Sequence, residues 1–523
     1  MHRLDTDRVV IVGAGLAALY AALQLAPRPV LILSPDPLGT GASSILAQGG
    51  VAAAMDPADS AGAHAFDTIR AGAGSVLPDI ARLVTAEARD HILDLTALGT
   101  PFDVTDEGRY VLSREAAHSC ARVVRVSGDQ AGAEIMRTLV ALVRRTPSIQ
   151  VLEHVVATGL HSQGDTVTGV ELAHCAPNGS GSCLIRGPAV LLAGGGSGGL
   201  YAVTTNPHRI RGEVMGMAAR AGAVIADAEF VQFHPTAIDC GLDPAPLATE
   251  ALRGEGATLV NAAGIRFMQA MHPEAELATR DIVARAVYAQ TQSGGRPALD
   301  TRAAIGVRIH DEFPAVAAAC RAAGIDPAQQ PIPIAAAAHY HMGGVATDAN
   351  GKSSLSGLWA CGEAASTGLH GANRLASNGL LEALVFARRA ALDIDGQLGA
   401  SRRAAPVVTL PDLPPAPAAD PGLIARLRRT MTDGAGVIRD ADGLRRTLGE
   451  IAAIEAAQPD CAPLANMTAT ASLIAAAALA REESRGAHYR SDFPDQDGDT
   501  GQRSALTLTD ALALRHDARL EYT

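Results

Sequence analysis

The sequence predicts an α/β protein: a doubly wound sheet, interrupted by an inserted domain and followed by a helical bundle. The first observation is a strand, a glycine turn, a helix and a second strand between Val9 and Leu33, the unit that opens such a sheet. The second is that the pattern of a strand followed by glycine is absent from about 230 to 333 and resumes at His339. The third is helical periodicity over 422–485, as in LIARLRRTM. The length of 523 residues agrees with about three domains.

The first half of the chain alternates strands and helices. Apolar runs at 9–12 and 30–33 are typical of buried parallel strands, and the Ala/Leu-rich segment 16–25 predicts the helix between them. A small, Gly-rich segment at 39–54 leads into a helical region that reaches about Leu98. The later elements are a hairpin over 152–172 that turns near Gly164, a buried strand at 189–193, a Pro-rich linker at 401–421 and a polar, turn-rich tail beyond Asp492.

Composition excludes several classes of function. The chain carries 43 Lys and Arg residues, but Lys352 is the only lysine, so lysine chemistry has one candidate. A P-loop would need glycine at 346, where the chain has Ala346, so Lys352 is expected in a polar turn. The net charge of −12 gives no general attraction to nucleic acid or to anionic lipid. An anionic substrate would therefore need a locally basic site built from arginine.

Cysteine usage and the N-terminal segment predict a cytoplasmic protein. The seven cysteines form no C-x-x-C motif and are odd in number, which is unlike a disulfide framework or a Cys-ligated cluster. The apolar stretch that starts at Val9 approaches the length of a membrane span. Gly13 and Gly15 divide it into a strand and a helix, and acidic residues precede it. We therefore expect neither a signal peptide nor an anchor.

A dinucleotide-binding turn joins the first strand to the first helix. Its glycines, Gly13 and Gly15, allow a pyrophosphate to approach the backbone at the start of the helix, and the third small position is Ala18. The second strand ends in Ser34, not in the acidic residue that binds the ribose of NAD. Glycine-rich strand ends at 194–199 and 357–364 favour FAD, a longer cofactor that needs contacts from distant segments.

Arginine and histidine residues among small residues form the candidate reactive site. Two or more arginines with several histidines suit a dicarboxylate, because arginine binds each carboxylate bidentately and stays charged. Each residue taken singly is as well explained by a surface ion pair or a satisfied core position, and the histidines show no metal spacing. The candidates are Glu115, His118, His234, Thr249, Glu250, Arg253, Glu255, Arg280, His339, His341, His370 and Arg374.

The order of these motifs resembles the succinate dehydrogenase/fumarate reductase flavoprotein family. The motifs are GAGLAAL, SSILAQGGVAA, TTNP, QFHPT, TEALRGEGA, RDIVARA, HYHMGG and GLHGANRLASN, and the resemblance runs from residue 8 to about 495. Ser43 stands where the membrane-complex members carry the histidine that binds FAD covalently, so the resemblance implies non-covalent FAD. Glu115 and the terminal ESRGAHYRSDFP segment are similar to those of the members that oxidise L-aspartate.

The resemblance implies a Rossmann-like FAD-binding domain interrupted by an α+β capping domain, with a C-terminal helical bundle. The implied ranges are 1–227 and 341–400 for the FAD-binding domain, 228–340 for the capping domain, 401–421 for the linker and 422–523 for the helical domain and tail. The residues implied to bind FAD are Gly13, Ala14, Gly15, Leu16, Ala17, Ser34, Ser43, Ser44, Ile45, Leu46, Ala47, Gln48, Gly49, Gly50, Glu213, Glu363, Gly379 and Leu380.

The implied reaction is hydride transfer from L-aspartate to flavin N5, which gives iminoaspartate on the route to quinolinate and NAD. Oxygen or fumarate would accept the electrons, and a quinolinate synthase would be a transient partner. His234, Thr249, His339 and Arg374 would hold the substrate carboxylates. Arg280 would donate and accept the proton, Glu250 and Arg253 would relay protons to it, and Glu115 would orient the amino group.

Several positions depart from the family pattern and keep alternatives open. Ala116 and Ala117 stand where glycines are common, and Gly379 stands where serine is common. Met342 is the form found in succinate and fumarate enzymes, which favours the first alternative, a soluble fumarate reductase or a succinate dehydrogenase flavoprotein subunit. A second alternative is a flavoprotein that only relays electrons, and Ser34 disfavours a third, an NAD-dependent dehydrogenase.

Overall fold

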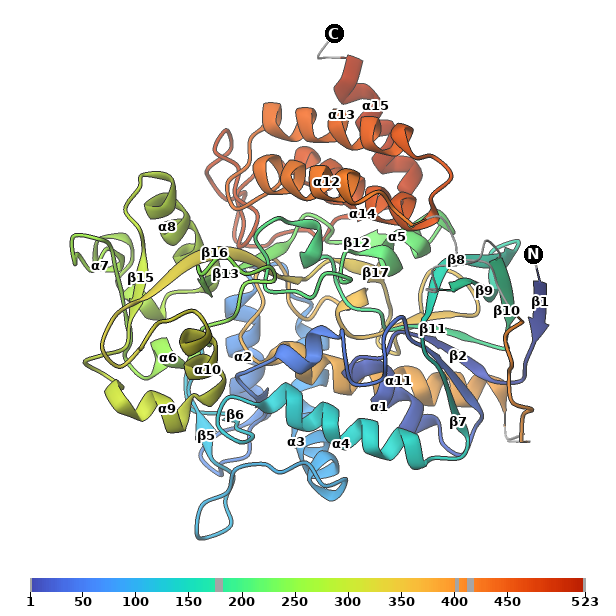
Figure 1. Ribbon diagram of the computed structural model, residues 1–523, viewed down its shortest axis with the longest axis horizontal. Helices are drawn as coiled ribbons and strands as arrows, with labels where there is room; N and C mark the ends of the chain where they lie inside the picture. Colours follow the sequence, from blue (N-terminus) through green and yellow to red (C-terminus); the bar gives the residue numbers. More distant parts are fainter. Residues whose placement is uncertain (1, 175–181, 400–403, 412–417, 521–523) are drawn as a thin grey trace.

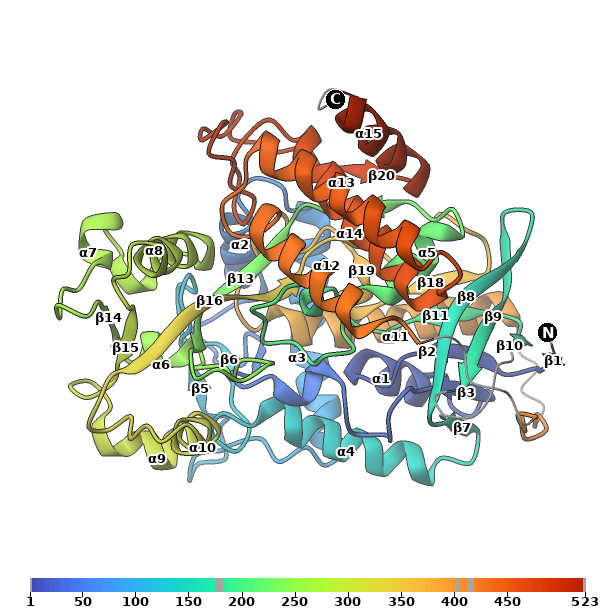
Figure 2. The same ribbon diagram turned by 45° about the horizontal axis from the view of Figure 1, so that its top comes forward.

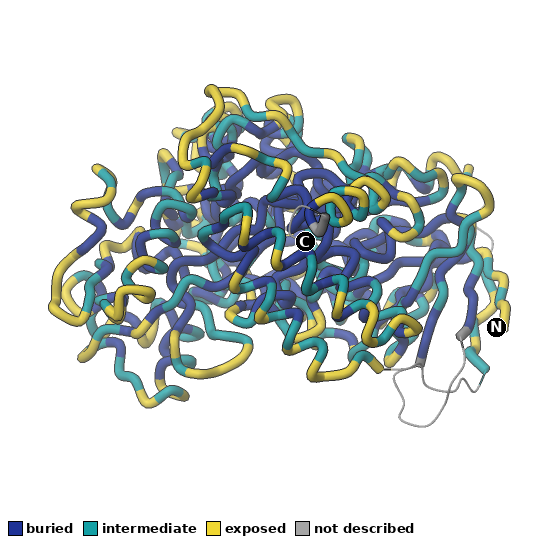
Figure 3. The backbone as a smooth tube through the Cα atoms, turned by 90° about the horizontal axis from the view of Figure 1, so that it is seen from above, coloured by how far each residue is buried: buried dark blue, intermediate teal, exposed yellow. Residues whose placement is uncertain are grey.

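The computed structural model describes residues 2–174, 182–399, 404–411 and 418–520. Figure 1 shows three groups of elements: a central α/β part, a yellow-green group at the left and orange to red helices at the top. In Figure 2 the orange helices lie across the central part. Figure 3 shows that the buried stretches of the chain run through the interior, with the exposed stretches mostly at the outside.

A five-stranded parallel sheet forms the centre of the α/β part. Its order is β18 (Leu358–Ala360), β11 (Val190–Leu192), β2 (Val9–Val12), β3 (Val30–Leu33) and β7 (Ile149–Leu152). Both faces are covered, so alternate side chains enter different cores. Val9 and Ile11 pack with the helix side, whereas Val10 and Val12 pack with the smaller sheet on the other side. This explains why the strands are continuous apolar runs.

Helices and small sheets surround the central sheet. The predicted helix is α1 (Leu16–Leu25), and the predicted hairpin is β8 (Val155–Gln163) with β9 (Thr166–His174). The other helices here are α2 (Ala61–Ala71), α3 (Pro78–Ala97), α4 (Ala131–Arg145), α5 (Glu213–Arg220) and α11 (Asn378–Leu398), with short turns η1 (Ser43–Leu46), η2 (Gly198–Leu200) and η5 (Gly362–Ala364). The remaining strands are β1 (His2–Asp5), β4 (Val51–Ala52), β5 (Leu112–Ser113), β6 (Val123–Val124), β10 (Ser182–Arg186), β12 (Ile225–Ala226), β17 (Gly344–Ala346) and β19 (Ala365–Ser366).

The yellow-green group of Figure 1 is built on two long antiparallel strands. β13 (Val231–Ile238) pairs with β16 (Ile332–His341), so that His234 lies opposite Ala337. The sequence predicted mixed helices and loops here and missed these strands, because β16 contains a run of four alanines and β13 contains a proline. The other elements are β14 (Thr258–Val260), β15 (Ala298–Asp300), α6 (Ala251–Gly254), α7 (Met268–Met271), η3 (Ala275–Leu277), α8 (Arg280–Gln292), η4 (Gly306–Arg308), α9 (Ile309–Glu312) and α10 (Pro314–Ala322).

The predicted helical bundle is formed by α12 (Pro421–Gly434), α13 (Ala441–Ala457) and α14 (Ala462–Ala480). Carboxylates of Asp420 and Asp440 cap the first two helices. The prediction of an irregular tail was wrong for its end: β20 (Ala505–Leu506) pairs with β12, and α15 (Leu508–Leu520) packs on the bundle.

One helix among the described residues is long and apolar enough to cross a membrane by length and composition alone. This is α14, whose apolar window is 78% buried inside the protein, against α13, α5 and α15. A core helix of this kind passes the same test, so the burial of α14 accounts for its composition. The stretch that starts at Val9 is the strand β2 followed by α1.

Candidate active site

A cavity of about 610 Å³ opens at the carboxyl ends of β2, β3 and β11. Open parallel sheets bind ligands at this edge, and the volume lies within the usual range of ligand pockets. The cavity extends from Ser34 to His339 and Arg374, so it joins the central sheet to the yellow-green group. The predicted residues that line it are Gly13, Ala14, Gly15, Leu16, Ala17, Ser34, Ser43, Ser44, Ile45, Leu46, Ala47, Gln48, Glu213, Glu363, Gly379 and Leu380.

The glycine turn is packed too tightly for any side chain. Gly13 has φ +118°, and a Cβ there would lie 2.2 Å from the carbonyl oxygen of Ala193. This close approach places the ends of β2 and β11 side by side at the start of α1. The Leu16 amide donates a hydrogen bond to Ser44 Oγ at 3.1 Å, which holds η1 over the same helix end. Free amides of this helix end can bind a phosphate.

Ser34 is engaged by its own loop. Its hydroxyl donates to the carbonyl oxygen of Asp36 at 2.6 Å, and the Asp36 carboxylate forms an ion pair with Arg209 at 3.1 Å. The residue directly after β3, where NAD enzymes hold the ribose with a carboxylate, is thus a serine, and the nearby Asp36 carboxylate is paired with Arg209. The neighbouring Ser43 hydroxyl donates to Asn206 Oδ1 at 3.2 Å.

Two carboxyl groups in the cavity are close to half-protonated at neutral pH. Burial raises the pKa of Glu213 to about 7 and that of Glu363 to about 7. Glu363 Oε1 also accepts a hydrogen bond from the His341 amide at 2.9 Å, which fixes its side chain. Each carboxyl group can thus donate or accept a hydrogen bond toward ligand hydroxyl groups.

His339 on β16 lines the far end of the cavity, and His234 on β13 is buried beside it without lining the cavity. Their ring centroids are 4.9 Å apart, and Thr205 Oγ1 lies 2.8 Å from His339 Nδ1. Burial, and then the nearby Arg280, lower the pKa of both imidazoles well below the ordinary value. Both rings are therefore neutral hydrogen-bonding groups, and His234 Nε2 is buried without a hydrogen-bond partner.

Arg374 lies beside this histidine pair. Its guanidinium stacks 4.4 Å from the centre of the Tyr340 ring, and its buried Nε has no hydrogen-bond partner. Burial, followed by the charge of Arg280, lowers the pKa of Arg374 to about 10, so the side chain remains a cation at neutral pH. Buried polar groups without partners are rare, so these atoms point to a bound anion.

Arg280, Glu250 and Arg253 form a buried chain of alternating charges. Glu250 forms ion pairs with Arg280 and, at 3.0 Å, with Arg253. Arg280 Nη1 donates to Gln232 Oε1 at 3.1 Å, and Gln232 Nε2 donates to the carbonyl oxygen of Arg374 at 2.9 Å. Gln232, the first residue of QFHPT, thus connects the two arginines, a role that the sequence analysis missed.

The small cavity beside this chain is lined by Glu250, Arg280 and Arg374 together with Ala116 and Ala117. The small cavity lies between the charged chain and the loop that carries Glu115, and both Arg280 and Arg374 line it. Thr249 is buried just before α6.

Glu115 is buried on the loop between β5 and β6. Ser377 Oγ donates to Glu115 Oε2 at 2.8 Å, and burial, followed by the charge of Glu250, raises the pKa of Glu115 to about 6. Glu115 can pack this closely against residue 49 only because that residue is glycine: a Cβ on Gly49 would lie 2.3 Å from Glu115 Oε1. Gly49 and Gly50, both predicted to bind the cofactor, do not line the large cavity. Gly49 is needed for the approach of Glu115.

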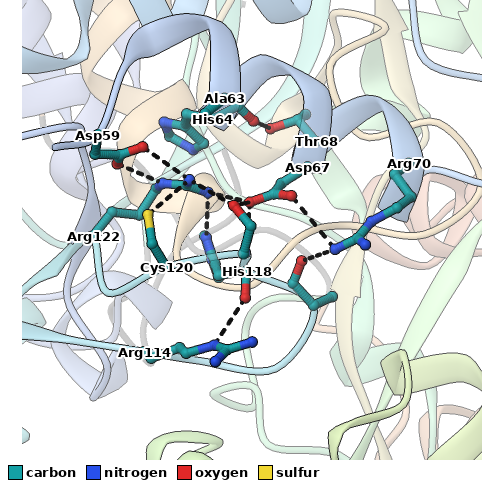
Figure 4. A network of polar contacts seen from close by, with 12 residues as sticks. Asp59, Ala63, His64, Asp67, Thr68, Arg70, Arg114, His118, Cys120 and Arg122 are labelled. Atoms are coloured by element: carbon teal, nitrogen blue, oxygen red, sulfur yellow. Dashed lines mark hydrogen bonds and ion pairs between the residues drawn. The ribbon is translucent and has the colours of Figure 1, made fainter. Parts of the chain in front are cut away.

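A network centred on Arg122 holds this loop against α2 (Figure 4). Arg122 forms ion pairs with Asp67 at 2.5 Å and Asp59 at 2.9 Å, and its Nη1 lies 3.2 Å from His118 Nδ1. Asp67 also accepts hydrogen bonds from the amide and hydroxyl of Ser119, each at 2.7 Å. His118 Nε2 lies 3.0 Å from the carbonyl oxygen of Ala376. His118 is therefore a buried structural residue in this network.

The remaining candidates lie outside the candidate site. His341 contacts Ser197 Oγ and the carbonyl oxygen of Ala228, and His370 pairs with Glu382 at 2.8 Å. Glu255 is exposed. Met342 packs in a small core with Phe230 and Tyr340. Tyr340 lines the large cavity but Met342 does not, so its packing role accounts for its presence.

The parallel sheet, the glycine turn and the long cavity that ends at buried arginines and histidines define a flavoprotein oxidoreductase. The protein-family model described as "FAD binding domain" matches residues 8–380, and that described as "Fumarate reductase flavoprotein C-term" matches 424–522. FAD is therefore the cofactor, as predicted. Unpartnered polar atoms in the cavity and the packed glycine turn suit this anionic ligand.

Curated relatives narrow the class further. The chain is 54% identical to an L-aspartate oxidase of Caulobacter vibrioides, over 97% of each chain. It is 45% identical to an L-aspartate oxidase of Agrobacterium fabrum, over 98% of this chain and 96% of the relative. The chain belongs to the L-aspartate oxidase family of FAD-binding flavoproteins.

Among solved structures, E. coli quinol fumarate reductase is similar with a TM-score of 0.85. The two chains are 28% identical over 95% of this chain and 93% of that one. The predicted resemblance, fold class and cofactor are thus confirmed.

Proposed function

We propose that this protein oxidises L-aspartate to iminoaspartate, with oxygen or fumarate as the electron acceptor. The observation that carries the proposal is a buried carboxylate, Glu115, on a loop that lines a small cavity together with Arg280 and Arg374. A dicarboxylate needs the cations, and an added ammonium group needs the carboxylate. Bound FAD supplies the hydride acceptor at flavin N5.

Substrate orientation is assigned to the arginine and histidine side chains. Arg374 and the neutral rings of His234 and His339 offer hydrogen-bond donors for the two carboxylates, and Thr249 adds a hydroxyl group. Fixing both ends of the substrate leaves its Cα in one orientation, and such orientation can lower a barrier by about 7–11 kcal/mol. Glu115 binds the ammonium group and aligns it.

Proton movement is assigned to Arg280 with Glu250 and Arg253. Glu250 contacts both guanidinium groups, so the three side chains form one continuous hydrogen-bonded path. Burial opposes ionisation of Glu250, but the charges of Arg280 and Arg253 hold its pKa below the ordinary value. The carboxylate therefore stays ionised and can accept a proton from either arginine.

The cofactor is proposed to be held non-covalently. Ser43 stands at the position of the flavin-linking histidine and is hydrogen-bonded to Asn206. None of the cysteines in the described part of the chain forms a disulfide bond, which supports a reducing, cytoplasmic location. We expect small molecules as partners. Because iminoaspartate is reactive, the proposal also includes a transient contact with a quinolinate synthase.

A peroxide assay tests the proposed function. The purified yellow protein is given L-aspartate or succinate in air, and hydrogen peroxide is measured. We expect peroxide with L-aspartate only. Activity on succinate without activity on L-aspartate would favour the fumarate reductase alternative, which the likeness to quinol fumarate reductase supports. Inactivity on both would favour an electron-relay protein.

A further inference from the structure

Arg211 is a cavity-lining cation without a partner. It lies in the turn before α5, and its buried Nε has no hydrogen-bond partner. Nearby arginines differ, since Arg209 pairs with Asp36 at 3.1 Å and Arg428 binds both oxygens of Asp243 at 2.6 and 2.9 Å. Within the described ranges, the Arg211 guanidinium forms neither a hydrogen bond nor an ion pair.

The surroundings do not neutralise this charge. Burial lowers the pKa of Arg211. The acidic groups that oppose this shift are Glu213 and, more weakly, Asp243, and neither forms an ion pair with Arg211 within the described ranges. Burial also raises the pKa of Glu213 to about 7, so this carboxyl group carries only part of a negative charge at neutral pH. A partly buried cation without a counter-charge destabilises a folded protein. Its presence in a cavity wall indicates an anion that arrives with the ligand.

The position of Arg211 identifies which part of the ligand it meets. A Cβ on Gly194 would lie 2.2 Å from Val214 Cγ2, and one on Gly13 would lie 2.9 Å from Gly194 Cα. The start of α5 is therefore packed against the glycine turn that starts α1, and both starts line the cavity. The neighbouring Arg209 reaches Asp36 beyond β3, far from the histidine pair. This is the phosphate-binding half of the cavity.

We propose that Arg211 binds the diphosphate of FAD and that its unpaired charge destabilises the protein whenever the cofactor is absent. The diphosphate is the anionic part of FAD, and a guanidinium can meet its oxygens bidentately. The assignment goes beyond the glycine turn, which supplies only backbone amides. Arg211 therefore has opposite effects on the stability of the two states: it stabilises the holoenzyme and destabilises the apoprotein.

The first test measures binding without turnover. Apoprotein is titrated with FAD, ADP and adenosine, using flavin fluorescence for FAD and calorimetry for the others. We expect Arg211→Gln to weaken the binding of FAD and ADP about 10- to 100-fold, the usual range for a charge-assisted hydrogen bond. We expect the affinity for adenosine to stay unchanged. Arg220→Gln is the matched control, because Arg220 lies at the other end of α5 and donates to Asn466 at 2.7 Å.

The second test measures thermal unfolding of both states. We expect the melting temperature of the Arg211→Gln apoprotein to equal or exceed that of the wild-type apoprotein. We expect the Arg211→Gln holoenzyme to release flavin at a lower temperature than the wild-type holoenzyme. Arg211→Lys keeps the charge and is expected to retain part of the ADP affinity. Unchanged affinity for FAD and ADP would overturn the proposal. So would equal losses for ADP and adenosine, or a destabilised apoprotein, since each would indicate a structural role.

Discussion

Ser377 Oγ donates a 2.8 Å hydrogen bond to Glu115 Oε2 and so joins two loops that are 262 residues apart in the sequence. One loop carries Glu115, and the other carries Arg374 three residues before Ser377. The spacing between Glu115, the proposed ligand of the amino group, and Arg374, the proposed ligand of a carboxylate, therefore depends on this contact. Ser377 itself has φ +61°, so the second loop is held in an uncommon conformation.

Glu115→Gln is expected to separate two activities of the site. The amide keeps the size and the contact with Ser377 but loses the charge that attracts an ammonium group. We expect kcat/KM for L-aspartate oxidation to fall about 10- to 100-fold, as for the loss of a buried charged hydrogen bond, and fumarate reduction to change little. Steady-state kinetics in both directions measure this, with Glu255→Gln, a change at an exposed glutamate outside the site, as the control. Equal losses in both directions would contradict the role of Glu115.

The pH profile of aspartate oxidation is expected to carry an acid limb near pH 6. Burial and Glu250 raise the pKa of Glu115 to about 6, so the carboxylate is protonated as the pH falls through that value. The protonated form cannot attract the substrate ammonium group, so kcat/KM declines below pH 6. Because kcat/KM reports groups of the free enzyme, the limb is expected to vanish in Glu115→Gln. A limb that persists in the variant would assign it to another group.

Arg280→Leu is expected to remove fumarate reduction nearly completely. The change deletes the guanidinium that contacts both Glu250 and Gln232, and with it the proposed proton path to the substrate. Arg285→Leu, on the same helix α8, is the control, because Arg285 pairs with Asp281 and lies outside the charged chain. Rates with a reduced dye measure the effect. Retention of more than a tenth of the activity would exclude Arg280 as the proton donor.

Asp67→Ala is expected to destabilise the protein through Arg122. Arg122 is fully buried and would keep only Asp59 as a charged partner, and loss of one partner of a buried ion pair costs about 3–5 kcal/mol. Arg70→Ala removes the exposed pair with the same carboxylate and is expected to cost less than about 1 kcal/mol. Urea unfolding compares the two variants. Similar midpoints for both would contradict a buried hub at Arg122.

Ala117→Gly is expected to stabilise the protein. Ala117 has φ +66°, a left-handed conformation that costs a residue with a side chain about 1–2 kcal/mol and that glycine adopts freely. Ala116 does not have a positive φ, so Ala116→Gly gains nothing and adds freedom to the unfolded chain. We expect a higher melting temperature for the first variant and a lower one for the second. The reverse order would contradict the strain at Ala117.

The sequence by itself determined the parts of the protein that depend on neighbouring residues. Apolar periodicity predicted β2, α1, β3 and the bundle, because side-chain spacing fixes which face of a short segment is buried. The glycine turn predicted the nucleotide end of the cavity for the same local reason. The alanine-rich β16 and the terminal α15 have weaker apolar periodicity, so their secondary structure became evident only from their packing in the fold.

The tertiary structure decided which polar residues act together. The pairing of β13 with β16 brings His234 to His339, and the packing of Gly49 brings Glu115 to Ser377. Arg209 and Arg211 look alike in the sequence, yet among the residues that the structure describes only Arg209 has a charged partner. A charge is satisfied or left free by partners that are distant along the chain. Its role therefore becomes visible only when the fold has placed those partners.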